Sequence, residues 1–111
     1  MNIVQKSENL TRKQIYDMIN SPAVQKMTNA KGQVLPVLGY VLYEDVNKDG
    51  EVQSLLSILT ENDEAYATNS KTFIGDFMTC VNIAAEELHS VEVLEGMSKA
   101  GRPFIMCRWY D

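Results

Sequence analysis

The stretch DVNKDGEV, which begins at Asp45, has the residue types of half a calcium-binding loop. Its Asp, Asn, Asp and Gly fall at positions 1, 3, 5 and 6 of an EF-hand, whose side-chain oxygens bind the ion. Position 12, however, is Leu56, where an EF-hand requires a bidentate Glu. Asp-Gly between two strand-like patterns is also a strong hairpin signal. We therefore interpret the stretch as a turn and expect no metal site.

No other residues have the spacing of a catalytic site. The single histidine, His89, stands near the end of a predicted helix, where a favourable dipole contact is the simpler interpretation. Glu86 and Glu87 are adjacent, so their side chains point in different directions and make a poor acid–base pair. Cys80 and Cys107 lack the close spacing of a zinc site, and we expect two free, mostly buried thiols, with a disulfide as the alternative. We expect no cofactor and no enzymatic activity.

Length and composition indicate one globular domain. The chain has 111 residues, of which 45% are hydrophobic and 23% charged, enough for one core. No apolar run has the length of a membrane helix, and the first residues lack the apolar segment of a signal peptide, so we expect a cytoplasmic protein. The net charge of −5 argues against a partner held only by attraction to phosphates, but it permits a local basic groove.

Residues 1–30 are predicted to form a helical extension. A polar arm precedes TRKQIYDMIN, a helix in which Thr11 and Gln14 have the capping-box pattern. SPAVQKM predicts a second short helix, with Ser21 as N-cap and Pro22 in the first helical position. Two short helices could form a helix-turn-helix that reads duplex DNA, but a helical flap packed on the domain is the better interpretation.

Residues 31–111 predict a small domain of the α+β class, mainly β. Strand patterns and one helix pattern are found at residues 33–44, 51–60, 65–69, 70–88 (the helix), 91–97 and 103–110. The first strand is apolar on both faces, so both should be covered, and Gly39 in its middle predicts a bend or bulge. This order matches an OB-fold, a five-stranded Greek-key barrel, here with the helix between strands three and four. A small α+β sandwich would also fit.

Aromatic faces for bases and cations for phosphates are what a single-strand binder needs. Tyr40 and Trp109 are candidates for stacking, because both lie in predicted strands. Tyr40 and Tyr43 should face opposite sides of their strand, and one of Trp109 and Tyr110 should face outward. Acids gather elsewhere, in YED, ENDE and AAEELHSVEVLE, which suggests one basic side, although a solvated charged face would look similar. The cations of that side are Lys31, Lys71, Lys99, Arg102 and Arg108.

Two stretches, AYATNSKTFIGDFMTCV and VEVLEGMSKAGRPFIMCRW, together resemble the small single-stranded-DNA-binding proteins of phages, including protein-primed phages. The first stretch resembles these proteins in an aromatic strand that runs into SKT at a helix start. The second resembles them in a strand that leads through a Ser-Lys-x-Gly turn into a closing aromatic strand. The upstream NAKGQVLPVLGYVLYE fits the first strand of the same proteins, so the resemblance covers residues 28–110.

This resemblance implies an OB-fold that coats single-stranded DNA in phage replication or recombination, without strong sequence preference. Carried over by residue, it points to Tyr66, Ser70, Lys71, Ser98, Lys99 and Arg102. The implied partners are single-stranded DNA and phage or host replication proteins, and a homodimer stays open. Two alternatives are a non-enzymatic phage adaptor or inhibitor on an OB-like fold, which the net charge favours, and a duplex-DNA regulator that uses residues 11–27.

Overall fold

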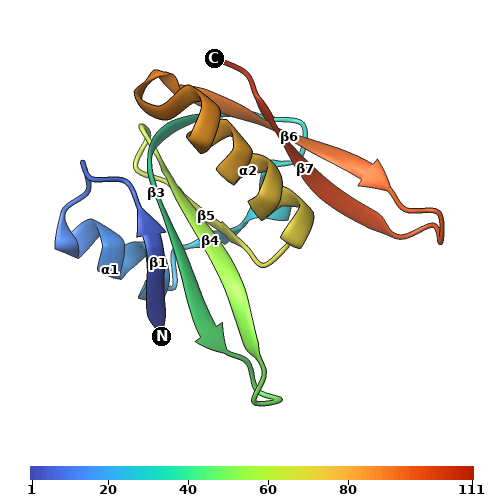
Figure 1. Ribbon diagram of the computed structural model, residues 1–111, viewed down its shortest axis with the longest axis horizontal. Helices are drawn as coiled ribbons and strands as arrows, with labels where there is room; N and C mark the ends of the chain where they lie inside the picture. The colour runs from blue at the N-terminus through green and yellow to red at the C-terminus, as the bar shows by residue number, and fades with distance from the viewer.

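From residue 34 onward, the elements follow one another in the predicted order. The computed structural model describes all residues from 1 to 111 (Figure 1). In chain order the elements are β1 (Asn2–Lys6), α1 (Arg12–Asn20), β2 (Gln25–Lys26), the 3-10 helix η1 (Met27–Ala30), β3 (Val34–Val46), β4 (Val52–Thr60), β5 (Ala65–Thr68), α2 (Lys71–Ala84), the 3-10 helix η2 (Ala85–Glu87), β6 (Ser90–Met97) and β7 (Pro103–Trp109).

β3 connects the two halves of a curled, mixed sheet, which makes the fold α+β and mainly β. Residues Val34–Pro36 of β3 pair with β6, whereas the part from Val37 onward pairs with β4. The predicted irregularity is confirmed, because the pairing shifts between Val37 and Gly39. A Cβ atom on Gly39 would lie 2.6 Å from Leu10 Cδ2, so close packing also favours glycine here. The strand order is β2-β5-β4-β3-β6-β7, with β1 also beside β3, and only the β2–β5 pair is parallel.

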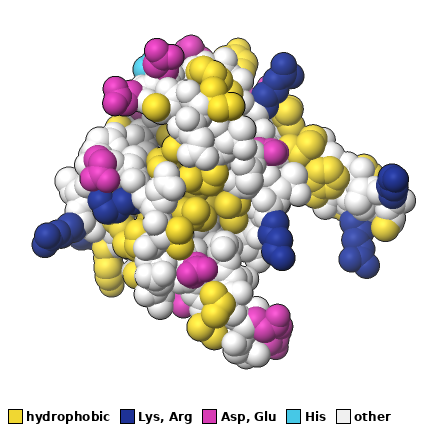
Figure 2. Space-filling view, in the orientation of Figure 1, with side chains coloured by type: hydrophobic (Ala, Val, Ile, Leu, Met, Phe, Trp, Pro, Cys, Tyr) yellow, Lys and Arg dark blue, Asp and Glu magenta, His cyan; other side chains and the backbone are white.

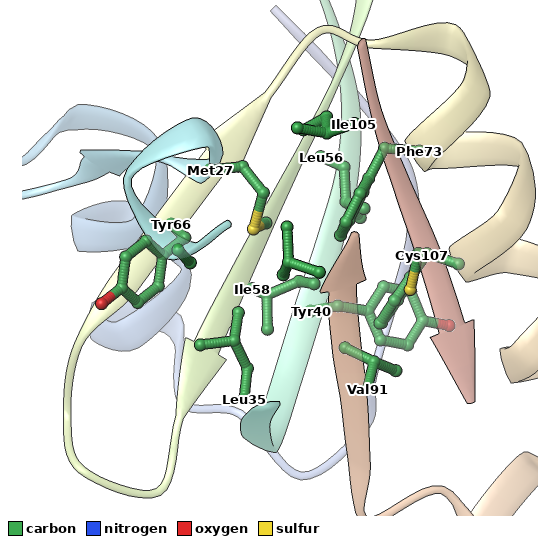
Figure 3. Close-up of a cluster of buried hydrophobic side chains, with 13 residues drawn as sticks. Met27, Leu35, Tyr40, Leu56, Ile58, Tyr66, Phe73, Val91, Ile105 and Cys107 are labelled. Carbon is green, nitrogen blue, oxygen red and sulfur yellow. The ribbon is translucent and has the colours of Figure 1, made fainter. Parts of the chain in front are cut away.

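The main core lies between α2 and the inside of the curled sheet (Figure 3). Phe73 and Phe77 stand one turn apart on α2 and are completely buried. The ring of Tyr40 packs edge-on against Phe77, with 5.4 Å between the ring centroids. α2 begins after Ser70, whose side chain accepts a hydrogen bond from the Phe73 backbone N–H. It ends at Ala84 rather than at Leu88, and His89 follows five residues later, after η2.

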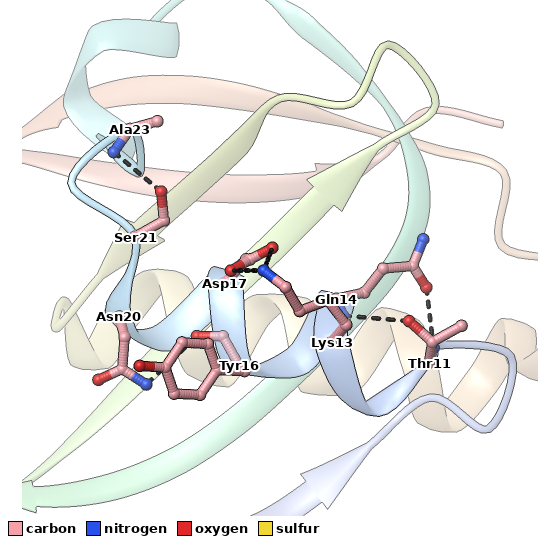
Figure 4. A network of polar contacts seen from close by, with 8 residues as sticks. All are labelled: Thr11, Lys13, Gln14, Tyr16, Asp17, Asn20, Ser21 and Ala23. Atoms are coloured by element: carbon pink, nitrogen blue, oxygen red, sulfur yellow. Dashed lines mark hydrogen bonds and ion pairs between the residues drawn. The ribbon is translucent and has the colours of Figure 1, made fainter.

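α1 covers the opposite face of β3 and β4 and forms a second apolar cluster. The buried residues of this cluster are Leu10, Ile15, Met18, Val41, Tyr43 and Leu59. The predicted capping box is present: Thr11 Oγ1 accepts from the Gln14 backbone N–H, and Gln14 Oε1 accepts from that of Thr11 (Figure 4). β3 is therefore covered on both faces, as predicted.

Residues 1–30 differ most from the prediction. The expected polar arm forms β1, which pairs antiparallel with β3. The predicted second helix over residues 21–27 is wrong: β2 pairs with β5, and η1 follows. Met27 and Ala30 of η1 are almost completely buried in the main core, and this burial outweighs the local helix signals. Ser21 Oγ accepts from the Ala23 backbone N–H in a tight turn rather than capping a helix (Figure 4).

The turn between β3 and β4 is the predicted hairpin. The Asn47 backbone N–H donates to the Glu51 carbonyl at 2.9 Å, and Gly50 has a φ of 78° that glycine readily adopts. Asn47 Oδ1 accepts from the backbone N–H groups of Asp49 and Glu51, at 2.9 and 3.0 Å. The oxygen that suggested a calcium ligand is thus engaged in the turn itself. No helix of the protein has the length and apolar character needed to cross a membrane.

Candidate nucleic-acid interface

A groove with a volume of about 350 Å³ opens where the end of β5 meets the start of β7. These two strands do not pair, and buried residues of η1 pack into the core beside β5. The groove residues are Thr28, Lys31, Thr68, Asn69, Ser70, Glu95, Pro103, Phe104 and Ile105. Two of the predicted binding residues, Lys31 and Ser70, therefore lie in one groove.

The N-terminus of α2 forms one wall of the groove. Thr68 Oγ1 accepts from the Ser70 backbone N–H at 3.0 Å, and Ser70 Oγ caps the helix. These bonds fix the chain at the point where it turns from β5 into the 14-residue helix. The helix start carries partial positive charge, and the exposed Lys71 follows directly. Ser70 thus caps the helix, and the positive character of this wall comes from the helix end and Lys71.

The groove contains one ion pair. Lys31 Nζ lies 2.6 Å from Glu95 Oε2, and both side chains are nearly half exposed. The other three ion pairs are at distant positions, so Lys71, Lys99, Arg102 and Arg108 make no ion pair, although Glu92 stands directly across from Arg108.

β6 and β7 extend beyond the groove as a two-stranded arm with a basic tip (Figures 1 and 2). In the turn, the Ser98 backbone N–H donates to the Arg102 carbonyl at 2.9 Å, and Ser98 Oγ accepts from the Arg102 backbone N–H at 3.1 Å. Gly101 adopts a φ of 77°, as the predicted hairpin loop requires. Ser98 therefore shapes the turn, whereas the side chains of Lys99 and Arg102 are exposed.

The face of the arm that points away from the core carries a half-buried aromatic ring. Alternation along β7 places Phe104, Met106 and Arg108 on this outer face, while Ile105 points into the core. Gly96 is the cross-strand partner of Phe104, and a Cβ atom there would lie 2.6 Å from Phe104 Cζ. The ring thus lies against the glycine on the outer face of the arm, and residue Phe104 also borders the groove.

The structure separates three predicted aromatic residues from this surface. Tyr40 and Tyr66 are only 8% and 6% exposed, inside the main core, so their ring faces are not free to stack on bases (Figure 3). The Tyr40 hydroxyl accepts a hydrogen bond from Gln5 Nε2 at 2.9 Å. Trp109 is 41% exposed, but it stands five residues from Phe104, roughly 16 Å along the strand.

Two groove residues, Phe104 and Glu95, are not among the predicted binding residues. Phe104 could have been found from the hairpin register, because the SKAGR loop places it opposite Gly96. An aromatic ring that covers a cross-strand glycine is a recurrent way to complete a sheet surface. The contact of Glu95 with Lys31 joins residues far apart in the chain, and no local pattern indicates it.

The two cysteines are weak nucleophiles. Burial raises the pKa of the Cys107 thiol far above its ordinary value and also raises that of Cys80. The Cys107 backbone N–H donates to Asp76 Oδ2 at 3.2 Å, which connects β7 to α2. Both thiols are free, buried and protonated at neutral pH, so their contribution is to packing.

The groove offers Lys31 and the N-terminus of α2, and the neighbouring arm offers Lys99, Arg102 and, on its outer face, the ring of Phe104. These groups can bind phosphates and stack on bases. Comparison with protein-family models, with curated proteins and with solved structures gives no match to this chain.

Proposed function

We propose that this protein binds single-stranded DNA without strong sequence preference, in phage DNA replication or recombination. The observation that carries the proposal is the position of Phe104, which lines the groove and stands two residues from the unpaired Arg102. Lys31 lines the same groove, and Lys71 follows the groove residue Ser70 directly. A strand whose base stacks on this ring would therefore have cations nearby for its phosphates.

In this proposal, the cations follow the DNA backbone while Phe104 receives a base. Neither interaction depends on base identity, since every base has a π-face and every nucleotide a phosphate. A duplex hides the faces of its bases by stacking, so it can engage the cations but not the ring. Single strands should therefore bind more tightly than duplex DNA of the same length.

We further propose that β3–β7 and α2 form an open OB-fold, with residues 1–30 as its N-terminal extension. The pairings β3–β4, β4–β5, β3–β6 and β6–β7, and the helix between β5 and β6, support this assignment. The pairing between β5 and β7 that would close the barrel is missing. The extension holds one α-helix, α1, together with β1, β2 and η1.

The extension changes which surface is open to DNA. OB-folds commonly bind oligonucleotides on the face of strands two and three and on the loop between strands four and five. Here those strands are β4 and β5, and α1 packs against them. The loop between the last two strands is Ser98–Arg102, at the tip of the arm. The proposed interface therefore moves from the covered face to the arm and the groove.

The proposal is tested by fluorescence anisotropy of labelled oligo-dT, with a duplex of equal length as comparison. We expect micromolar or tighter binding at low salt, a steep loss of affinity as salt rises, and much weaker binding to the duplex. Absence of oligo-dT binding at low salt would refute the proposal.

A second candidate is a protein-interaction module, which the tip of the β3–β4 hairpin favours. Val46 and Val52 are directly opposed there and remain 58% and 67% exposed. Acidic residues surround this apolar pair: Asp45, Asp49 and Glu51. An exposed apolar pair with a polar rim is typical of protein contacts. If oligo-dT does not bind, this tip is the place to search for a protein partner.

A further inference from the structure

Lys31 differs from the other cations of the proposed interface because it forms an ion pair, with Glu95. Lys31 Nζ and Glu95 Oε2 are 2.6 Å apart, and both residues line the groove. The remaining interface cations make no ion pair. One carboxylate is therefore held at the position where a phosphate would meet the ammonium group.

The backbone around this pair is tightly fixed. The Gly32 backbone N–H donates to the Val93 carbonyl at 2.8 Å, and the Val93 backbone N–H donates to the Gln33 carbonyl at 2.9 Å. Gly32 has a φ of 79°, which glycine adopts without strain. Lys31 directly precedes Gly32, and Glu95 lies two residues after Val93. These backbone bonds therefore hold the two residues close enough for their side chains to meet.

We infer that Glu95 takes the place of a DNA phosphate in the free protein and is displaced from Lys31 when a single strand enters the groove. This inference rests on the proposed function. Carboxylate and phosphate oxygens accept the same charge-assisted hydrogen bonds from an ammonium group. Both side chains are nearly half exposed, and exposed ion pairs contribute little to stability, so the exchange costs little.

Glu95 thus acts as a negative gate that weakens the binding of every strand. Its removal should raise affinity, because the ammonium group is then unoccupied and no carboxylate stands beside the incoming phosphate. Two unit charges about 4 Å apart in water-like surroundings correspond to about a fivefold change in affinity. We therefore expect Glu95→Gln to bind oligo-dT about fivefold more tightly than wild type at about 0.1 M salt.

The test compares oligo-dT affinities of wild type, Glu95→Gln, Lys31→Met and the matched control Glu86→Gln. Glu86 is an exposed acid beyond the other end of α2, roughly 20 Å from the groove. In titrations at about 0.1 M salt, where the Debye length is about 10 Å, its change removes the same charge at a screened distance. We expect tighter binding for Glu95→Gln, weaker binding for Lys31→Met and less than a twofold change for Glu86→Gln.

The possible failures can be told apart. If wild type binds and Glu95→Gln does not bind more tightly than Glu86→Gln, the gate is refuted while the proposed function stands. If none of the four proteins binds oligo-dT, the proposed function fails and the gate fails with it. Thermal melting of each variant checks that the exposed substitutions leave the fold intact.

Discussion

Replacing both Lys99 and Arg102 by alanine should weaken the binding of all single strands and flatten its salt dependence. The two side chains are exposed at the tip of the arm and have no acidic partner, so each is available to one phosphate. The turn itself is held by hydrogen bonds that involve only backbone groups and Ser98 Oγ. The double substitution should therefore remove two positive charges and leave the hairpin folded.

The size of the effect follows from counterion release. Each phosphate contact on a single strand contributes about 0.7 to the slope of log affinity against log salt. Loss of two contacts should lower the slope by about 1.4, so that a tenfold rise in salt weakens wild type about 25-fold more than the variant. If the lost contacts are purely electrostatic and vanish near 1 M salt, the variant should bind about 25-fold more weakly at about 0.1 M.

The assay is an anisotropy titration of oligo-dT and of a mixed-sequence oligonucleotide across a salt series. The matched control is Arg12→Ala/Lys13→Ala, which removes the same charge from α1, on the side of the sheet away from the main core. An arm variant that binds with wild-type affinity and slope, or a control that loses as much as the arm variant, would refute the assignment of phosphate contacts to the arm.

Three further predictions concern the ring, a backbone position and the thiols. Phe104→Ala should weaken single-strand binding by about 1–3 kcal/mol while Phe104→Trp retains it, because a stacked base needs an aromatic face; equal affinities would exclude stacking at this ring. Ala85 has a φ of 50° and a ψ of −122°, a conformation that strains a residue with a Cβ atom. Ala85→Gly should therefore raise the free energy of unfolding, measured in urea, by about 1 kcal/mol. An unchanged free energy of unfolding would contradict this strain. Burial raises the pKa of Cys80 and Cys107 in the folded protein above the ordinary 9.0, so the unfolded chain loses these protons first as pH rises. The free energy of unfolding should therefore be fully retained below pH 9.0 and fall above it, less so in Cys80→Ala/Cys107→Ala; a fall of equal size in that variant would contradict the cause given.

The elements with strong local signals could be predicted from the sequence. The capping box of α1, the Asp-Gly hairpin and the irregularity at Gly39 each depend on a few neighbouring residues, and all three are present. The predicted helix over residues 70–88 starts correctly at the Ser70 cap but ends at Ala84, where the backbone takes a positive φ at Ala85. The local sequence therefore predicts helix starts and hairpin turns more accurately than helix ends.

The N-terminal elements depend on contacts that no local pattern reveals. β1 is mostly exposed, because its backbone pairs with β3 while its side chains face solvent. Met27 and Ala30 are buried by distant parts of the chain, and this burial determines the conformation of η1. Tertiary packing therefore overrides the helix signals of SPAVQKM.

The candidate site could be predicted only in part. Lys99 and Arg102 are exposed, as expected for charged residues in a turn that projects from the core. Tyr40 and Tyr66 are buried because their strands are covered on both sides, so alternation of side chains cannot tell which ring is free. The Lys31–Glu95 contact depends on the bend of β3 toward β6, which only the folded chain shows.

The most direct test of the proposed interface is an NMR titration of isotope-labelled protein with oligo-dT. We predict that backbone amide shifts concentrate at the groove and the arm, at residues 28–31, 68–71 and 95–106, and spare α1. Shifts confined to α1 or to the β3–β4 hairpin, or no shifts at saturating oligo-dT, would contradict the account.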